Sequence, residues 1–155
     1  MIKLIKTTAR DLESIFEFQA DTRAVQMAAF TSENPGDKSA YMSKWTKIIE
    51  NPNIHMMSIF NDEELVGSIL HFDMGDETNV SYGISPSHWG KGYASKGLSA
   101  FLQSTSKRPL YGRAAFDNIG SQKVMEKNGF KRVGKEVAFA NARKAEIEEF
   151  VYLLD

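Results

Sequence analysis

The segment from residue 79 to residue 102 constrains the fold more than any other part of the chain. The stretch from Asn79 to Ile84 has the composition of a strand and stops at Ser85-Pro86, because proline lacks the N–H that a strand ladder needs. A glycine-rich turn, Gly90-Lys91-Gly92, comes next. Apolar residues then recur at helical spacing, at Ala94, Gly97, Leu98, Phe101 and Leu102. The segment therefore predicts a strand, a tight turn and a helix in succession.

This turn has the features of an anion site. Gly90 and Gly92 lack a β-carbon, so the backbone can curl tightly and bring several N–H groups close to a ligand. The helix that follows adds its own unpaired amides and about +0.5 charge at its N-terminus. A phosphate or pyrophosphate site is predicted, and a turn that binds nothing is the open alternative. A Rossmann loop would need a third glycine, and a Walker loop would need Gly-Lys-Ser/Thr; neither pattern is present.

The rest of the chain predicts the order strand, two helices, three strands, helix, strand, helix and two strands. Thr8, with Asp11 three residues later, is typical of a helix N-cap, and Asn118 is typical of another. The strands are expected at residues 2–5, 54–60, 65–74, 79–84, 109–116, 130–137 and 147–154. A strand, turn, helix and strand between residues 79 and 116 indicate a parallel pair within a mixed sheet.

Bulk properties exclude several classes of protein. The length of 155 residues favours one domain over residues 1–155. With 19 basic and 20 acidic residues, the chain has no broad basic surface for nucleic acid. It has no cysteine, so disulfides, thiolate metal sites and cysteine nucleophiles are excluded, and no metal is expected. No apolar run approaches the ~20 residues that span a bilayer, and no leader is visible, so no membrane partner and a cytoplasmic location are expected.

Two motifs resemble one known family. Trp89-Gly90-Lys91-Gly92-Tyr93-Ala94 resembles the acetyl-CoA pyrophosphate loop of the GNAT N-acetyltransferase superfamily, Gln/Arg-x-x-Gly-x-Gly/Ala, with Trp89 in place of Gln or Arg. This tryptophan and the preceding Ile84-Ser85-Pro86 resemble the subgroup of ribosomal-protein N-terminal acetyltransferases. A second family signature is matched by Asn118, Ser121, Val124, Lys127, Gly129 and Phe130. The resemblance covers roughly residues 54 to 135.

The resemblance implies a fold and a cofactor site. It implies an α+β (mixed α/β) fold with a mostly antiparallel sheet of six or seven strands, a splayed parallel pair and about four flanking helices. The pantetheine arm of acetyl-CoA would lie between the strands at 79–84 and 109–116, with the acceptor between the first two helices and the last hairpin. The cofactor-binding residues implied are Ile84, Pro86, Trp89, Gly90, Lys91, Gly92, Tyr93, Ala94, Ser95, Asn118 and Ser121.

The activity implied is transfer of the acetyl group from acetyl-CoA to a primary amine, by direct attack on the thioester. The amine would be a protein N-terminal α-amine or a small-molecule amine, and the protein would be a monomer or homodimer. The Ser121 hydroxyl would protonate the leaving thiolate. The sequence departs from the family at Asn79, where many relatives carry glutamate, and at Met125, where many carry tyrosine. His71 and Glu136 are the candidate replacement bases.

The absence of the family's usual proton-handling residues affects which acceptor amine is expected. Removing a proton from a lysine amine, with a pKa of about 10.4, costs roughly 4.6 kcal/mol at pH 7, whereas an α-amine with a pKa of about 8 needs much less. An α-amine or another weakly basic amine is therefore the expected acceptor. The alternatives are a non-catalytic acyl-CoA-binding sensor or structural protein of the same fold, a module that transfers aminoacyl or larger acyl groups, and a regulatory domain that binds phosphate.

Overall fold

The computed structural model describes residues 1–155. Its elements are β1 (Ile2–Lys6), α1 (Ala9–Ala20), α2 (Thr22–Ala28), α3 (Lys38–Glu50), β2 (His55–Asn61), β3 (Glu64–Met74), β4 (Glu77–Ile84), the 3-10 turn η1 (Pro86–His88), α4 (Tyr93–Ser104), β5 (Leu110–Ala115), α5 (Ile119–Lys127), β6 (Lys131–Ala140) and β7 (Ala145–Leu154). The predicted order is confirmed, with the short helix α2 in addition. This helix buries none of its residues, so it has no apolar stripe by which the sequence could signal it.

The strands form one seven-stranded sheet in the order β1-β2-β3-β4-β5-β7-β6. Every neighbouring pair is antiparallel except β4 and β5, which are parallel. The fold is therefore a mixed α/β fold with a mostly antiparallel sheet, as predicted. No helix of the structure combines the length and the apolar character needed to cross a membrane.

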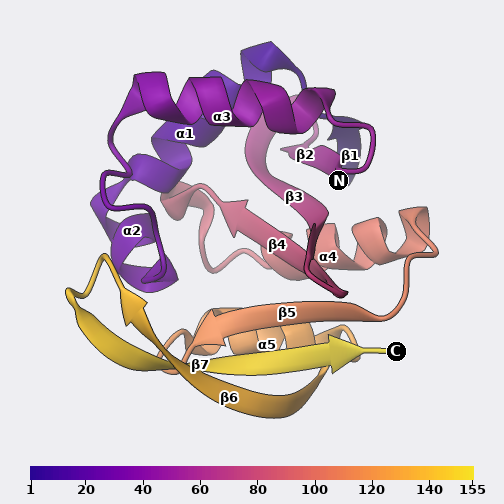
Figure 1. Ribbon diagram of the computed structural model, residues 1–155. Helices are drawn as coiled ribbons and strands as arrows, with labels where there is room; N and C mark the ends of the chain where they lie inside the picture. Colours follow the sequence, from indigo (N-terminus) through magenta and orange to yellow (C-terminus); the bar gives the residue numbers. More distant parts are fainter.

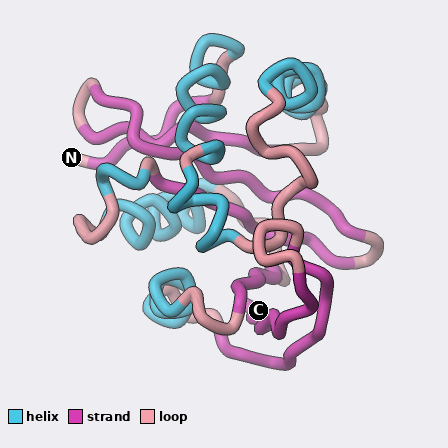
Figure 2. The backbone as a smooth tube through the Cα atoms, turned by 90° about the vertical axis from the view of Figure 1, so that its left-hand side faces the viewer, coloured by secondary structure: helices cyan, strands magenta, loops and turns pink.

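Helices cover both faces of this sheet. Helices α1 and α3 pack side by side over one face, and α4 and α5 lie against the other (Figure 1). Successive strand residues point to opposite faces, so Ile69 packs in the cluster with Phe101 of α4, while Leu70 packs with Leu12 of α1. Figure 2 shows the strand layer running between the two sets of helices. We call the side of α1 to α3 the acceptor face, because the resemblance implies that the acetyl acceptor binds there. The opposite side, covered by α4 and α5, is called the donor face; neither name refers to hydrogen bonding.

Local capping explains where the helices begin. The side chain of Thr8 accepts a hydrogen bond from the amide of Asp11, and the carboxylate of Asp11 accepts one from the amide of Thr8. This is the predicted capping box, which satisfies two otherwise unpaired donors at the start of α1. The side chains of Asp37 and Asn118 cap α3 and α5 by accepting from the amides of Ala40 and Ser121. Helix α4 differs, because its N-cap is Gly92 and no side chain caps it.

The parallel strands β4 and β5 separate along their length. They are in register only at Asn79 and Tyr111, and they diverge towards their carboxyl ends (Figure 1). Each strand is held by its outer neighbour, because β3 pairs with β4 up to Ile84 and β7 pairs with β5 up to Ala115. The expected splay is therefore present, and it opens beside the turn that leads into α4.

Candidate active site

The turn before α4 presents a run of free backbone donors. No backbone or side-chain acceptor receives a hydrogen bond from any amide between Gly90 and Ser95. The next amide, that of Lys96, donates to the carbonyl of Gly92 at 3.1 Å. Gly90 and Gly92 have φ values of +81° and +79°, a region that favours glycine, and the space around both is open. Consecutive free amides at a helix N-terminus form the anion cradle that the sequence predicts.

Side chains around this cradle fix its position. The Trp89 Nε1 donates to the carbonyl oxygen of Ile84 at 2.9 Å, which ties the turn to the end of β4. The Tyr93 hydroxyl accepts from Asn61 Nδ2 at 3.0 Å, and the Ser95 hydroxyl accepts from Asn128 Nδ2 at 3.2 Å. The predicted cofactor residues of this segment, Ile84, Pro86, Trp89, Gly90, Lys91, Gly92, Tyr93, Ala94 and Ser95, thus lie in one continuous stretch at the open end of the splay.

The start of α5 lies across the gap from β4. The Asn118 side chain accepts from the amide of Ser121 at 3.2 Å, and its Nδ2 donates to the carbonyl of Met27 at 3.4 Å. Ser121 Oγ lies 2.9 Å from the hydroxyl of Tyr82 on β4. Burial raises the pKa of Tyr82 to about 12, so this hydroxyl stays protonated at neutral pH. Sequence reasoning missed Tyr82, whose partner comes from a distant helix.

Asn79 and Met125, the positions where the resemblance implies glutamate and tyrosine, are both buried. Met125 is 1% exposed, and its Sδ would lie 2.5 Å from a β-carbon at Gly112, so it fills the space that this glycine leaves. Asn79 is 3% exposed, and its Nδ2 has no hydrogen-bond partner. A thioether and a neutral amide cannot exchange protons near pH 7, so proton transfer requires other groups.

His71 lies on the donor face, away from the acceptor face. Its ring is 5.6 Å from that of His55 and 5.7 Å from that of Phe101, which belongs to α4. Burial, followed by the charge of His55, lowers the pKa of His71. The structure thus does not bring His71 together with Glu136, the other candidate base, which lies on β6.

A charged cluster stands on the acceptor face beside the splay. The Arg113 guanidinium of β5 lies 3.2 Å from Glu77 Oε1, 2.9 Å from Glu136 Oε2 and 3.8 Å from Glu149 Oε1. Burial raises the pKa of Glu149, and the nearby Arg113 opposes this only in part. We call these four residues the Arg113 cluster. One signal for Glu149 was missed in the sequence, where it interrupts the apolar alternation of Ile147, Val151 and Leu153.

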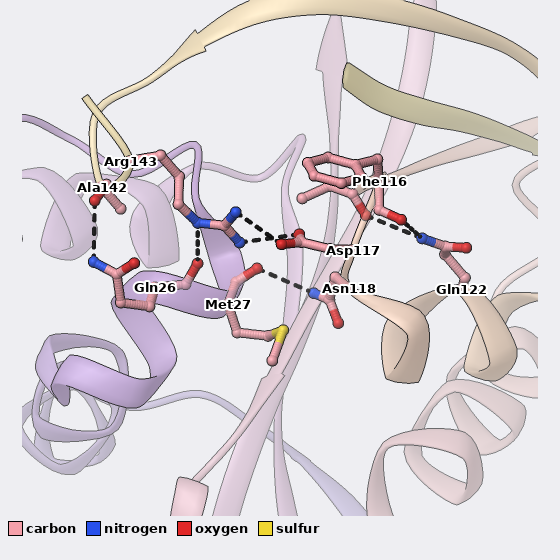
Figure 3. Close-up of polar contacts among 9 residues, drawn as sticks. Gln26, Met27, Phe116, Asp117, Asn118, Gln122, Ala142 and Arg143 are labelled. Carbon is pink, nitrogen blue, oxygen red and sulfur yellow. Dashed lines mark hydrogen bonds and ion pairs between the residues drawn. The ribbon is translucent and has the colours of Figure 1, made fainter. Parts of the chain in front are cut away.

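Helix α2 closes over the separated ends of β4 and β5. Arg143, from the turn between β6 and β7, binds both carboxylate oxygens of Asp117 at 2.9 and 3.0 Å and donates to the carbonyl of Gln26 at 2.9 Å (Figure 3). The Gln26 side chain donates in turn to the carbonyl of Ala142 at 3.0 Å. The hydrogen bond from Arg143 holds the pKa of Asp117 below its usual range. Helix α2 is thereby tied to both the β6–β7 turn and the β5–α5 connection.

Two cavities border this region. A cavity of about 640 Å³ lies on the acceptor face between α3 and strands β3 and β4. Its lining includes the aromatic residues Phe30, Trp45 and Phe72, together with Ser81 of β4. A second cavity, of about 510 Å³, lies under α2 and is lined by Arg23, Gln26, Met27, Trp89, Asp117 and Arg143. The first cavity thus lies on the acceptor face, and the second lies where α2 meets Trp89 and Asp117.

The fold, the splayed parallel pair and the amide cradle are those of an acetyltransferase of the GNAT type. The model of the acetyltransferase (GNAT) domain matches residues 2–131, so the chain belongs to this family. No curated protein matches the sequence at a significant level.

Solved structures of acetyltransferases share the fold over nearly the whole chain. RimL, a ribosomal L7/L12 alpha-N-protein acetyltransferase in complex with coenzyme A, has a TM-score of 0.84 at 15% identity, covering 99% of this chain and 93% of that one. A spermidine N-acetyltransferase from Vibrio cholerae, in complex with CoA and spermine, has a TM-score of 0.79 at 18% identity, covering 98% and 95%. The yncA protein of Salmonella typhimurium, with acetyl-CoA, has a TM-score of 0.81 at 16% identity, covering 99% and 93%.

Proposed function

We propose that the protein is a cytoplasmic acetyltransferase that moves the acetyl group of acetyl-CoA to a primary amine, an α-amine by preference. The observation that carries the proposal is the uninterrupted run of free amides from Gly90 to Ser95 at the N-terminus of α4. Such a run suits a diphosphate, because each phosphate oxygen can accept from several main-chain donors and the helix dipole favours the negative charge. Family membership and CoA complexes among the similar structures support acetyl-CoA as the donor.

The splay gives the thioester a route between the two faces. In this proposal the pyrophosphate lies on the cradle and the pantetheine arm runs between β4 and β5, near Ile84 and Pro86. The Ser121 and Tyr82 hydroxyls, 2.9 Å apart, line the donor side of the gap. Transfer forms a bond from the amine nitrogen to the carbonyl carbon and breaks the carbon–sulfur bond. Ser121 supplies a proton to the departing thiolate and takes the proton of the Tyr82 hydroxyl in turn, and solvent then reprotonates Tyr82.

The amine also loses a proton, and we assign its removal to Glu149. Of the carboxylates in the Arg113 cluster, Glu149 is the least exposed and lies farthest from the guanidinium, at 3.8 Å. A raised pKa and a weak ion pair make it a better proton acceptor than Glu136, which is exposed and bonded to Arg113 at 2.9 Å. Glu136 is the second candidate, and His71 takes no part in the proposal because it lies on the donor face.

Titration calorimetry with acetyl-CoA, combined with a thiol-release assay on a panel of amines, tests this function. We expect acetyl-CoA to bind and thiol to be released only when an amine is present, with N-terminally free peptides as better acceptors than the same peptides blocked at the N-terminus. Equal rates on free and blocked peptides would contradict the α-amine preference. Binding without turnover on any amine would instead favour a sensor, an alternative that the buried Asn79 and Met125 keep open.

Trp89 offers a direct report on cofactor binding. Its indole donates to the Ile84 carbonyl, a group that the pantetheine arm would approach, so binding should change the environment of the ring. The chain has two tryptophans, and Trp45→Phe leaves Trp89 as the only one. We expect acetyl-CoA to change the fluorescence of this variant in a saturable way and to leave that of the matched Trp89→Phe variant nearly constant. An unchanged Trp89 signal at concentrations where calorimetry detects binding would place the cofactor elsewhere.

A further inference from the structure

The cavity of about 640 Å³ on the acceptor face has largely apolar walls. Leu70 and Phe72 of β3 line it from the sheet, and Trp45 of α3 and Phe30 line it from the helical layer. The ring of Trp45 stacks on that of Tyr41 at a centroid distance of 5.6 Å, which holds it in place. Because protein interiors are close-packed, open space of this size between aromatic side chains indicates room for a ligand. We call it the aromatic cavity.

The aromatic cavity borders the splay between β4 and β5. Ser81 of β4 lines the cavity and is exposed. It lies opposite Leu70 in the ladder of β3 and β4, so both side chains point to the acceptor face. The register of β4 with β5 is limited to Asn79, two residues before Ser81, and the strands diverge beyond it. A thioester held in the splay would therefore lie at the edge of this cavity.

The charges of the cavity restrict what it can bind. Lys44 and Asp73 are the only charged residues that line it, so its lining has no net charge near pH 7. A polyamine or an aminoglycoside would place further positive charges there without carboxylates to compensate them, which costs free energy. An apolar group gains free energy when it leaves water for such a cavity. The lining therefore favours an apolar or aromatic group.

We propose that the aromatic cavity binds the side chain of the acceptor, and that the acceptor is an α-amine whose α-carbon carries a large apolar or aromatic group. This inference rests on the proposed function and names its substrate class. The amine nitrogen lies near Ser81, beside the splay, and the side chain lies between Trp45 and Phe72. Trp45 is then a specificity residue that takes no part in the chemistry. Peptides that begin with a large apolar residue are the predicted acceptors.

Amino acid amides test the substrate class through the release of CoA thiol. Phenylalaninamide, alaninamide and lysinamide carry the same α-amine and differ in the side chain. We expect kcat/KM for phenylalaninamide to exceed that for alaninamide by about 10- to 100-fold, the effect of burying a phenyl group, and lysinamide to show no such gain. Trp45→Ala should lower kcat/KM for phenylalaninamide by about 5- to 10-fold, the range of one lost aromatic contact. The same variant should change kcat/KM for alaninamide by less than about twofold.

Two further variants separate specificity from folding. Trp45→Leu keeps an apolar residue against Tyr41, so it should hold Tm closer to that of the wild type while showing the same selective loss. Ser43→Ala changes an exposed residue of α3 that does not line the cavity, and it should leave the preference unchanged. Equal kcat/KM of the wild type for phenylalaninamide and alaninamide, or equal losses on both in the Trp45 variants, would overturn the proposal and leave the acetyltransferase assignment standing.

The fluorescence of Trp45 measures binding without turnover. In Trp89→Phe, Trp45 is the only tryptophan. We expect phenylalaninamide to change the fluorescence of this variant in a saturable way, and alaninamide at the same concentrations to leave it nearly constant. An unchanged signal with phenylalaninamide would place the side chain elsewhere and overturn the proposal. A saturable signal together with turnover of no amine would support the cavity as a binding site and overturn the proposed function.

Discussion

Replacing Gly92 by aspartate is expected to weaken acetyl-CoA binding by about 100-fold, because the new carboxylate would face the diphosphate on the cradle. Two unit charges about 5 Å apart at an effective dielectric constant of about 20 repel by roughly 3 kcal/mol. This energy corresponds to about a 100-fold change in Kd. The space around Gly92 is open, so the substitution should not disturb packing. Calorimetry with acetyl-CoA measures the change.

Two control variants separate charge from backbone strain. Gly92→Asn has nearly the same shape, and both residues tolerate the positive φ of this position comparably, so any difference between the two variants is electrostatic. Gly75→Asp introduces the same charge at another open glycine with φ of +60°, in the turn between β3 and β4. We expect Gly75→Asp to bind acetyl-CoA normally and Gly92→Asn to lose less than tenfold. Equal affinity of Gly92→Asp and Gly92→Asn would refute the cradle.

The fold could be predicted from the sequence wherever contacts between residues close in the chain determine the structure. Proline at residue 86 ends β4, the Thr8 and Asp11 pair caps α1, and Asn118 caps α5, each through contacts within a few residues. The parallel pairing of β4 and β5 could be expected because a strand, turn, helix and strand indicate a crossover connection, whereas their splay was expected only from the family resemblance. Helix α2 could not be expected, since it is held by polar contacts to Ala142 and Arg143 in the turn between β6 and β7, and Arg143 in turn binds Asp117.

The two parts of the candidate site also differed in how well the sequence predicted them. The cradle is one continuous segment, Gly90 to Ser95, so its glycines and the helix that follows predict it from the sequence. The acceptor face draws Asn79, Arg113, Glu136 and Glu149 from four strands, and no spacing rule connects them. Glu136 was identified only as one of two weak candidates, and Arg113 was not identified. The interrupted apolar alternation around Glu149 marks a carboxylate on an apolar face of its strand, but the residues that surround it depend on tertiary packing.

The second large effect is expected at Glu149. If it accepts the amine proton, Glu149→Gln should lower kcat/KM by about 100-fold or more, the usual contribution of a positioned general base. The amide has nearly the same shape but cannot take up a proton near neutral pH, so acetyl-CoA affinity should be unchanged. Glu148→Gln is the matched control, because Glu148 is the adjacent residue, is bonded to Lys135 at 3.1 Å, and should leave turnover within about twofold.

The pH dependence of the reaction gives a second measurement. Because burial raises the pKa of Glu149, the acid limb of the kcat/KM profile should lie above the pH at which an ordinary glutamate titrates. In Glu149→Gln this limb should be replaced by one set by the pKa of the acceptor amine, which must then lose its proton to solvent. The pH dependence of folding stability follows from the same raised pKa of Glu149. A folded-state pKa above the unfolded value favours the protonated form, so this stabilisation is present at low pH and is lost as the pH rises through the folded pKa. Wild type should therefore lose Tm relative to Glu149→Gln as the pH rises through the range in which Glu149 titrates.

Glu136→Gln decides between the two carboxylates of the cluster. Glu136 and Glu149 are in register across β6 and β7 and both lie near Arg113, so removing either negative charge alters the local field to a similar degree. A purely electrostatic role would therefore give similar losses in the two variants. A larger loss in Glu149→Gln, together with a shift of the acid limb to the pKa of the acceptor amine in that variant alone, is the result expected of a proton acceptor. The reverse pattern would transfer the role to Glu136, and an unchanged pH profile in both would exclude the cluster from proton transfer.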